Sequence, residues 1–227
     1  MPKIRTSFGF ISYKTYPLYI GVKVINKEIS RENLLLVKEI LDKHSVFFGL
    51  IAGTLLGAVR EHDFISHDED TDLYLLEEDK QKVFDILPEF LKDGFNIARY
   101  DRRGLLSIIR KGEYIDLYFF SDYGNQIRIC SGWCIPERFL LNTSQYVFQG
   151  SIFMVPKDYV AYLEYEYGMD WQTPIPYTDY TMNNWKRKML QLKEQAKDIL
   201  PNWAYFYLAR KAEKKIEKKY LEKISSL

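Results

Sequence analysis

The chain has 227 residues, 47% of them hydrophobic, 16% aromatic and 28% charged, a composition that excludes disorder and predicts one globular domain with at most an appendage. Its formal net charge of +1 is unevenly spread, because residues 1–29 and 184–227 are basic whereas residues 30–183 are acidic. No apolar run reaches the ~18 residues of a membrane span and no signal-peptide core is present, so we expect a cytoplasmic protein.

The first part of the chain predicts helices that alternate with short strands. Residues 16–27 alternate loosely and favour an edge strand or extended arm. Ser30 is the expected N-cap of a helix, since apolar residues recur after it at helical spacing. Residues 46–51 are almost wholly apolar, which indicates a buried strand. A short helix over residues 55–60 is expected to leave the turn that follows.

The remaining elements follow in chain order and end in a basic tail. They are a polar turn over 61–69, a strand over 72–76, a helix over 78–91 disturbed at Pro88, strands over 95–100, 105–110 and 114–120, a less regular region to Val155, a helix over 157–167, and a helical tail broken at Pro201. This order predicts an α+β fold, a small mixed sheet flanked by helices with a helical C-terminal extension.

Three carboxylates at alternate positions, Asp68, Asp70 and Asp72, lead into the strand over 72–76. Side chains two apart in an extended chain point to the same face, so Asp70 and Asp72 would project together and repel each other. A hard, oxygen-seeking cation such as Mg²⁺ or Mn²⁺ would neutralise them. A solvated acidic turn is the alternative that an acidic cluster alone leaves open.

Two neighbouring features favour a metal and phosphate site. Gly53 and Thr54 stand where a buried strand gives way to a helix, and the free N–H groups of a helix N-terminus suit a phosphate. Asp116 is a lone carboxylate in an otherwise apolar and aromatic strand, so it needs either a basic partner or the same metal. A strand–Gly-Thr–helix, a D-x-D strand and a third Asp together are typical of nucleotidyltransferase metal sites.

At these residues the chain resembles the LicD/fukutin family of phosphotransferases. The resemblance rests on Gly53-Thr54-Leu55-Leu56-Gly57-Ala58-Val59-Arg60, Phe64-Ile65, Asp68-x-Asp70-x-Asp72, Tyr114-Ile115-Asp116-Leu117, Val155-Pro156-Lys157-Asp158-Tyr159, Leu163 and residues 167–174. It spans about residues 30–180. The chain departs from the family pattern at His67, where Trp is usual, and at Glu69, where Asp is common.

The resemblance implies a nucleotidyltransferase-like fold that moves a substituted phosphate from a CDP-linked donor to a sugar hydroxyl of a cell-surface glycan and releases CMP. Choline, ribitol and glycerol phosphates are the implied cargoes. By the same resemblance, the metal-binding and catalytic residues are Asp70, Asp72 and Asp116, and the substrate-binding residues are Gly53, Thr54, Arg60, His67 and Asp68. For Arg60, a structural pair with an acidic neighbour is the alternative.

The domain organisation expected from these observations has three parts. Residues 1–29 form a basic arm, residues 30–180 the catalytic domain, and residues 181–227 a basic helical extension. Aromatic residues at one end of that extension favour either an anionic membrane surface or packing on the domain. A membrane contact would suit a lipid-linked acceptor, and no nucleic-acid-binding motif is present.

Three other functions remain open at this stage. The same fold would also support nucleotidyl transfer from an NTP with release of pyrophosphate. A catalytically idle binding or scaffold protein is possible in principle, although the intact carboxylate set argues against it. A D-x-D glycosyltransferase leaves the Gly53-Thr54 turn and Asp116 without an explanation.

Overall fold

The computed structural model describes residues 1–16, 24–174 and 200–225, together with single positions between 183 and 197. The strands are β1 Lys3–Thr6, β2 Gly9–Ser12, β3 Phe48–Leu50, β4 Asp70–Leu76, β5 Asn96–Asp101, β6 Leu105–Arg110, β7 Glu113–Gly124, β8 Ile127–Cys130, β9 Trp133–Pro136, β10 Thr143–Phe148 and β11 Ser151–Pro156. The helices are α1 Lys27–Lys43, α2 Ala52–Arg60, the 3-10 helix η1 Glu77–Asp79, α3 Lys80–Lys92, α4 Arg138–Leu141, α5 Tyr159–Tyr167 and α7 Asn202–Ile224.

A nine-stranded mixed sheet forms the centre of the molecule. Its main path runs in the order β10-β11-β3-β4-β7-β6-β5, and β8 and β9 continue it from the far end of the long strand β7. The pairs β4–β7 and β11–β3 are parallel, whereas the other neighbours are antiparallel. This confirms the expected α+β class with a mixed sheet.

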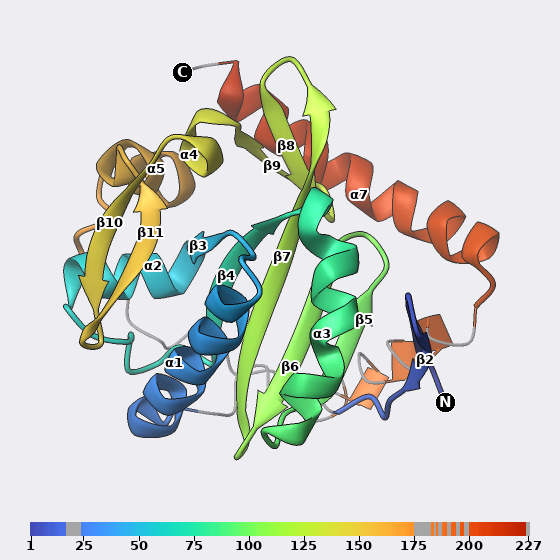
Figure 1. Ribbon diagram of the computed structural model, residues 1–227. Helices are drawn as coiled ribbons and strands as arrows, with labels where there is room; N and C mark the ends of the chain where they lie inside the picture. The colour runs from blue at the N-terminus through green and yellow to red at the C-terminus, as the bar shows by residue number, and fades with distance from the viewer. Residues whose placement is uncertain are drawn as a thin grey trace.

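Helices α1 and α3 cover one face of the sheet (Figure 1). On that face Phe119 of β7 packs edge-on against Phe84 of α3, with 6.1 Å between ring centroids. The apolar positions of α1 that were expected to face the core are all buried. The opposite face of β4 and β7 is therefore left for the polar side chains that alternate with these core residues.

Helix α1 begins earlier than the sequence suggested. The side chain of Asn26 accepts a hydrogen bond from the N–H of Ile29 at 3.1 Å, so Asn26 is the N-cap and the prediction of Ser30 was wrong. Ser30 is buried one turn into the helix, and both residue types cap equally well, which is why sequence alone misplaced the start. Residues 17–23 of the expected arm lie outside the described residues.

The region before Val155, expected to be irregular, contains two further hairpins, β8–β9 and β10–β11. Their turns place Ser131-Gly132 and Gln149-Gly150 at positive φ, the geometry of tight hairpins. Neither dipeptide is the Asn-Gly or Asp-Gly signal on which hairpin prediction relies, so the strands were missed. Helix α3 also runs through Pro88 as one element.

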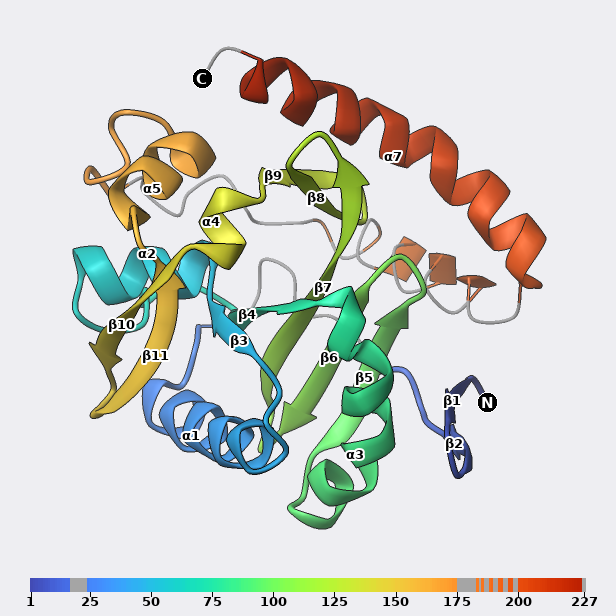
Figure 2. The same ribbon diagram turned by 45° about the horizontal axis from the view of Figure 1, so that its top comes forward.

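Helix α7 begins directly after Pro201, as expected, and packs on the domain beside the β8–β9 hairpin (Figures 1 and 2). The hydroxyl of Tyr220 donates to Glu166 Oε1 at 2.9 Å, and Lys223 Nζ donates to the Glu166 carbonyl at 3.1 Å. Most of the expected helical piece before Pro201 lies outside the described residues. Among the helices that are described, none combines the length and the apolar character needed to cross a membrane.

Candidate functional site

Strands β4 and β7 bring the predicted carboxylates together on one face of the sheet. The two strands run parallel, and Asp72 lies directly beside Asp116 in the register. Side chains alternate along a strand, so Asp116 points away from the face to which Phe119 and its partner Phe84 belong. Asp72 and Asp116 therefore share the face that α1 and α3 leave uncovered.

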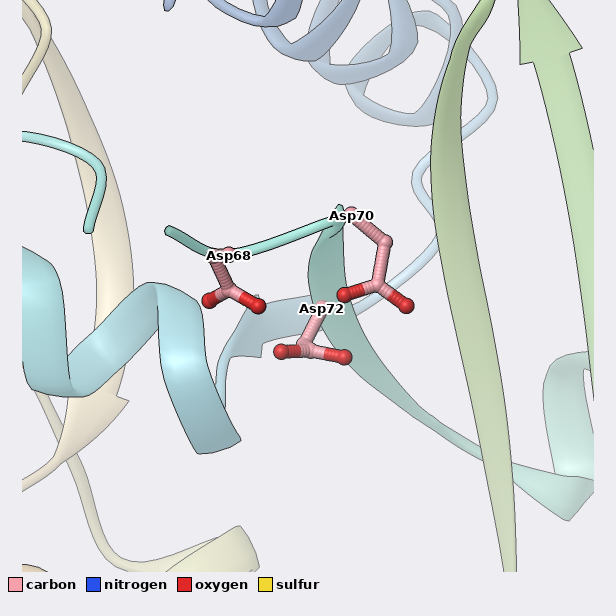
Figure 3. A group of neighbouring side chains, drawn as sticks. All are labelled: Asp68, Asp70 and Asp72. Carbon is pink, nitrogen blue, oxygen red and sulfur yellow. The ribbon is translucent and has the colours of Figure 1, made fainter. Parts of the chain in front are cut away.

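Asp68, Asp70 and Asp72 form a compact group at the start of β4 (Figure 3). Each offers one carboxylate oxygen, and these oxygens lie within 4.8 Å of one another. Asp68 belongs to the polar segment just before β4, whereas Asp70 and Asp72 belong to the strand itself and project to the same side, as expected. Three carboxylates at this separation are a donor set that suits a hard divalent cation.

The turn from β3 into α2 fixes the carboxylate of Asp72. The N–H of Gly53 donates to Asp72 Oδ2 at 3.1 Å, and the N–H of Asp72 itself donates to Thr54 Oγ1 at 2.7 Å. Ala52 has a φ of 50°, a strained value that makes the turn sharp, and its N–H donates to the hydroxyl of Tyr162 at 3.2 Å. The N-terminus of α2 is thus aimed at the acidic group.

Burial raises the pKa of all three carboxyl groups. The pKa of Asp68 rises from 3.8 to about 6, first through burial and then through its acidic neighbours Glu69 and Glu61. The pKa values of Asp70 and Asp72 are raised well above the usual value by burial and by repulsion within the group. A bound cation would relieve this repulsion and favour the ionised forms.

The metal-free protein is expected to become less stable as pH rises from about 4 to above 6. A raised carboxyl pKa means that the folded state binds the proton more tightly than the unfolded state does, so stability falls between the ordinary pKa of 3.8 and the raised values of Asp68 and its neighbours. Thermal unfolding in EDTA should show this fall, and Mn²⁺ should raise the Tm more at the higher pH. A Tm in EDTA that rises over this interval would contradict the burial of these carboxylates.

Asp116 is not one of the three mutually close carboxylates. Its Oδ2 accepts a hydrogen bond from Arg99 Nη2 at 2.9 Å and a longer one from the hydroxyl of Tyr118 at 3.4 Å. Of the two partners that the sequence left open, a basic residue is therefore the one observed. Asp68 takes the place in the close group where Asp116 was expected, and the assignment of Asp116 as a metal ligand stays a prediction.

The predicted substrate-binding residues Arg60 and His67 lie at different distances from the close carboxylate group. Arg60 is at the C-terminal end of α2, about 10 Å along the helix from Gly53, where its Nη2 pairs with Glu61 at 2.8 Å and its Nη1 donates to the Trp171 carbonyl at 3.2 Å. The pair with an acidic neighbour is thus present. His67 is half-buried beside Asp68, whose pKa its charge lowers in part.

Sequence reasoning missed Arg99 and Tyr162 near the carboxylates, and it named Tyr118 only as one candidate contact for a cationic head group. Tyr118 and Tyr162 each have a pKa raised well above the usual value, by burial first and then by nearby acidic groups that include Asp72. The spacing of Tyr118 two residues after Asp116 was the one available signal, because residues two apart in a strand share a face. Nothing in the sequence marked Arg99.

Comparison with known families gives one match over half of the chain. The family model described as "LicD/FKTN/FKRP, nucleotidyltransferase domain" matches residues 45–158. The matched segment contains the turn into α2, the close carboxylate group, Arg99 and Asp116.

The similar curated proteins come from two Rickettsia species. The chain is 38% identical over 64 residues to the uncharacterized protein RP689 of Rickettsia prowazekii, covering 28% of this chain, and 32% identical over 82 residues to the uncharacterized protein RT0683 of Rickettsia typhi, covering 36% of it. It spans about a quarter of the length of each, 24% and 25%.

Two solved structures have a similar arrangement at low sequence identity. The lincosamide antibiotic adenylyltransferase LnuA, with lincomycin bound, has a TM-score of 0.43 at 12% identity and covers 70% of this chain and 95% of its own. The antibiotic-resistance factor ANT(2'')-Ia has a TM-score of 0.48 at 12% identity and covers 88% of this chain and 95% of its own.

Proposed function

The chain belongs to the LicD/FKTN/FKRP nucleotidyltransferase-domain family, and from this premise we propose that it is a phosphotransferase that depends on Mg²⁺ or Mn²⁺. In this proposal it moves a substituted phosphate, such as phosphocholine or a polyol phosphate, from a CDP-linked donor to a sugar hydroxyl and releases CMP. The observation that supports it most is the close group of the half-buried Asp68 and Asp70 and the buried Asp72 at the N-terminus of α2. Catalysis of this kind consists mainly of positioning and charge neutralisation.

The roles of the chain's own residues follow from their contacts. Asp68, Asp70 and Asp72 would hold the cation, which supplies positive charge against the phosphates of the donor. Asp116 or Asp72 would accept the proton of the acceptor hydroxyl as its oxygen bonds to the distal phosphorus and the bond from that phosphorus to the CMP oxygen breaks. The observed contacts of Gly53 and Thr54 are hydrogen bonds to Asp72. Binding of donor phosphate is a second role that the proposal gives them.

Two further residues complete the proposed donor site. His67 stands beside Asp68 at the edge of the close carboxylate group, where it would contact the transferred head group. Arg60 would act on phosphate only from the far end of α2. The acceptor in this proposal is a glycan, lipid-linked if the protein works at a membrane.

The released nucleotide tests the proposal. The protein would be incubated with Mg²⁺ or Mn²⁺, candidate glycans and a panel of CDP-choline, CDP-ribitol, CDP-glycerol, NTPs and UDP-sugars. Release of CMP supports the proposal, whereas pyrophosphate would indicate nucleotidyl transfer and UDP a glycosyltransferase. No turnover together with no Mn²⁺ binding would indicate a scaffold protein.

The outer face of α7 supports a second part of the proposal, a peripheral contact with an anionic membrane at its cytoplasmic face. Trp203 and Tyr207 are 77% and 78% exposed, and they share one side of the helix with Lys214 and Lys218 because these positions are four, seven and four apart. The helix lies along the outer edge of the molecule (Figure 2). Aromatic residues at one end and lysines at the other suit a lipid interface with negative charge.

Vesicle flotation at low salt measures this contact. The protein is expected to float with vesicles of phosphatidylcholine and phosphatidylglycerol but not with phosphatidylcholine alone, because each Lys near an anionic surface contributes about 1 kcal/mol. Trp203→Ser with Tyr207→Ser should reduce binding, as should Lys214→Gln with Lys218→Gln. The matched control is Val147→Ser with Ile152→Ser, an exposed cross-strand pair of β10 and β11. Equal flotation of all variants would exclude α7 as the contact.

A further inference from the structure

A row of four polar side chains crosses the sheet at the site. Arg99 of β5 is the register partner of Ser107 of β6, Ser107 is the partner of Asp116 of β7, and Asp116 is the partner of Asp72 of β4. Directly paired residues of neighbouring strands share a face, so all four belong to the face that carries the carboxylates. The row joins the close carboxylate group to a cation on β5, three strands away from β4.

A β-bulge puts Arg99 into this row. Ile97 pairs with Ile108, but Arg99 pairs with Ser107, so Ala98 is an extra residue in β5. If the register continued without the bulge, Ala98 would pair with Ser107, and Arg99 would point to the face covered by helices. Bulges that re-aim one side chain recur next to active sites, and here the re-aimed residue is a cation.

The guanidinium of Arg99 holds Asp116 by one oxygen. Arg99 Nε donates to Ser107 Oγ at 3.1 Å, and Arg99 Nη2 donates to Asp116 Oδ2 at 2.9 Å. The side chains of Arg99 and Asp116 are 20% and 5% exposed, so this is a largely buried ion pair. Tyr118 also bonds to Oδ2, and within the described residues no hydrogen bond reaches Oδ1. The hydrogen bonds from Arg99 and Tyr118 therefore leave Oδ1 of Asp116 available to the acceptor hydroxyl.

We propose that Arg99 is the positioning residue of Asp116 and the internal counter-cation of the carboxylate site before a metal ion binds. The inference rests on the proposed function, since it names what orients one of its acidic residues. The charge of Arg99 also reaches Asp70, where it offsets part of the repulsion. A bound divalent ion would take over much of this neutralisation, so the ion and Arg99 stabilise the same negative charge.

Thermal unfolding of Arg99→Gln in EDTA and in Mn²⁺ separates this role from ordinary packing. In EDTA the variant should unfold roughly 2–4 °C below the unmodified protein, because the carboxylates lose their cation. In Mn²⁺ the deficit should shrink to less than half. The control is Arg110→Gln, which removes a guanidinium that pairs with Glu32 at the end of β6, and its deficit should be the same in both buffers.

The kinetic readout uses CMP release from CDP-choline, CDP-ribitol or CDP-glycerol. Arg99→Gln should lower kcat on the order of 10²-fold and leave the donor KM nearly unchanged, because Asp116 is misplaced while the donor still binds. Arg99→Lys, which keeps the charge but not the fork to Ser107, should recover part of the loss.

Two results would overturn the assignment of Arg99. One is a Tm deficit that is the same with and without Mn²⁺, and the other is a kcat close to that of the unmodified protein. If the unmodified protein binds Mn²⁺ and releases CMP while Arg99→Gln behaves like Arg110→Gln, only the role of Arg99 is excluded. An unmodified protein that neither binds Mn²⁺ nor releases CMP would exclude the proposed function as well.

Discussion

Asp70→Asn and Asp72→Asn are each expected to abolish metal-dependent transfer, with activity reduced by a factor on the order of 10³ or more, and to raise the Tm of the metal-free protein. Each substitution removes a negative charge from a buried group whose pKa is raised by burial and by its acidic neighbours. This negative charge destabilises the folded protein when no cation is bound, but it is required for binding the cation and therefore for activity. Loss of activity with a gain in stability is therefore the expected signature of a binding site rather than of a core contact.

Activity, Mn²⁺ affinity and thermal unfolding in EDTA would all be measured on these variants. Asp42→Asn is the matched control, because Asp42 is an exposed carboxylate of α1 that pairs with Lys38 at 2.5 Å. It should leave the activity and the Mn²⁺ affinity unchanged. Full activity in Asp70→Asn or Asp72→Asn would remove that residue from the proposed site, and a large loss of Tm would reveal a structural role instead.

Gly53→Ala is expected to weaken Mn²⁺ binding and activity by about 10- to 100-fold while the protein stays folded. A Cβ at position 53 would lie less than 3.0 Å from Asp68 Oδ2 and 3.3 Å from Asp72 Oδ2, so the carboxylate of Asp68 would have to move. The backbone has no need of glycine here, because Gly53 lies within α2 and is not among the glycines with positive φ. Alanine is also the better helix former, which offsets part of the strain.

Gly57→Ala in the same helix provides the contrast. Its Cβ would meet the backbone carbonyl of Asp63 at 2.6 Å, and backbone cannot turn aside as a side chain can. We expect a loss of about 1–3 kcal/mol of stability, with unchanged Mn²⁺ affinity in the molecules that remain folded. If Gly53→Ala instead bound Mn²⁺ as tightly as the unmodified protein, Asp68 would not be a ligand.

The features that sequence predicted well depend on local geometry. Asp70 and Asp72 share a face because they are two residues apart in a strand, and Gly53 lies at the start of a helix because an apolar run ends just before it. Both relations depend on neighbouring residues only and not on the tertiary structure. The predicted α+β class, with its mixed sheet, is confirmed for the same reason, since most of its strands and helices carry their own periodicity.

The features that sequence missed depend on hydrogen bonds between segments far apart. The hairpins β8–β9 and β10–β11 were not predicted, because their turns use Ser-Gly and Gln-Gly and their strands alternate weakly. The start of α1 was misplaced because Asn26 and Ser30 are equally good caps. The close carboxylate group also differed from the prediction, because it contains Asp68 in place of Asp116. Asp68 precedes β4, and its approach to Gly53 is set by the packing of α2.

The amino-acid sequence by itself determined the fold class and that Asp70 and Asp72 would lie together, because alternation along a strand and helical periodicity act over a few residues. Only the tertiary structure decided what faces Asp116. Its partner Arg99 comes from β5, two positions away from the strand β7 that carries Asp116, and one extra residue in β5 decides the face to which that guanidinium points. Register and bulges are fixed by hydrogen bonds between paired strands, so local patterns in the amino-acid sequence do not predict them.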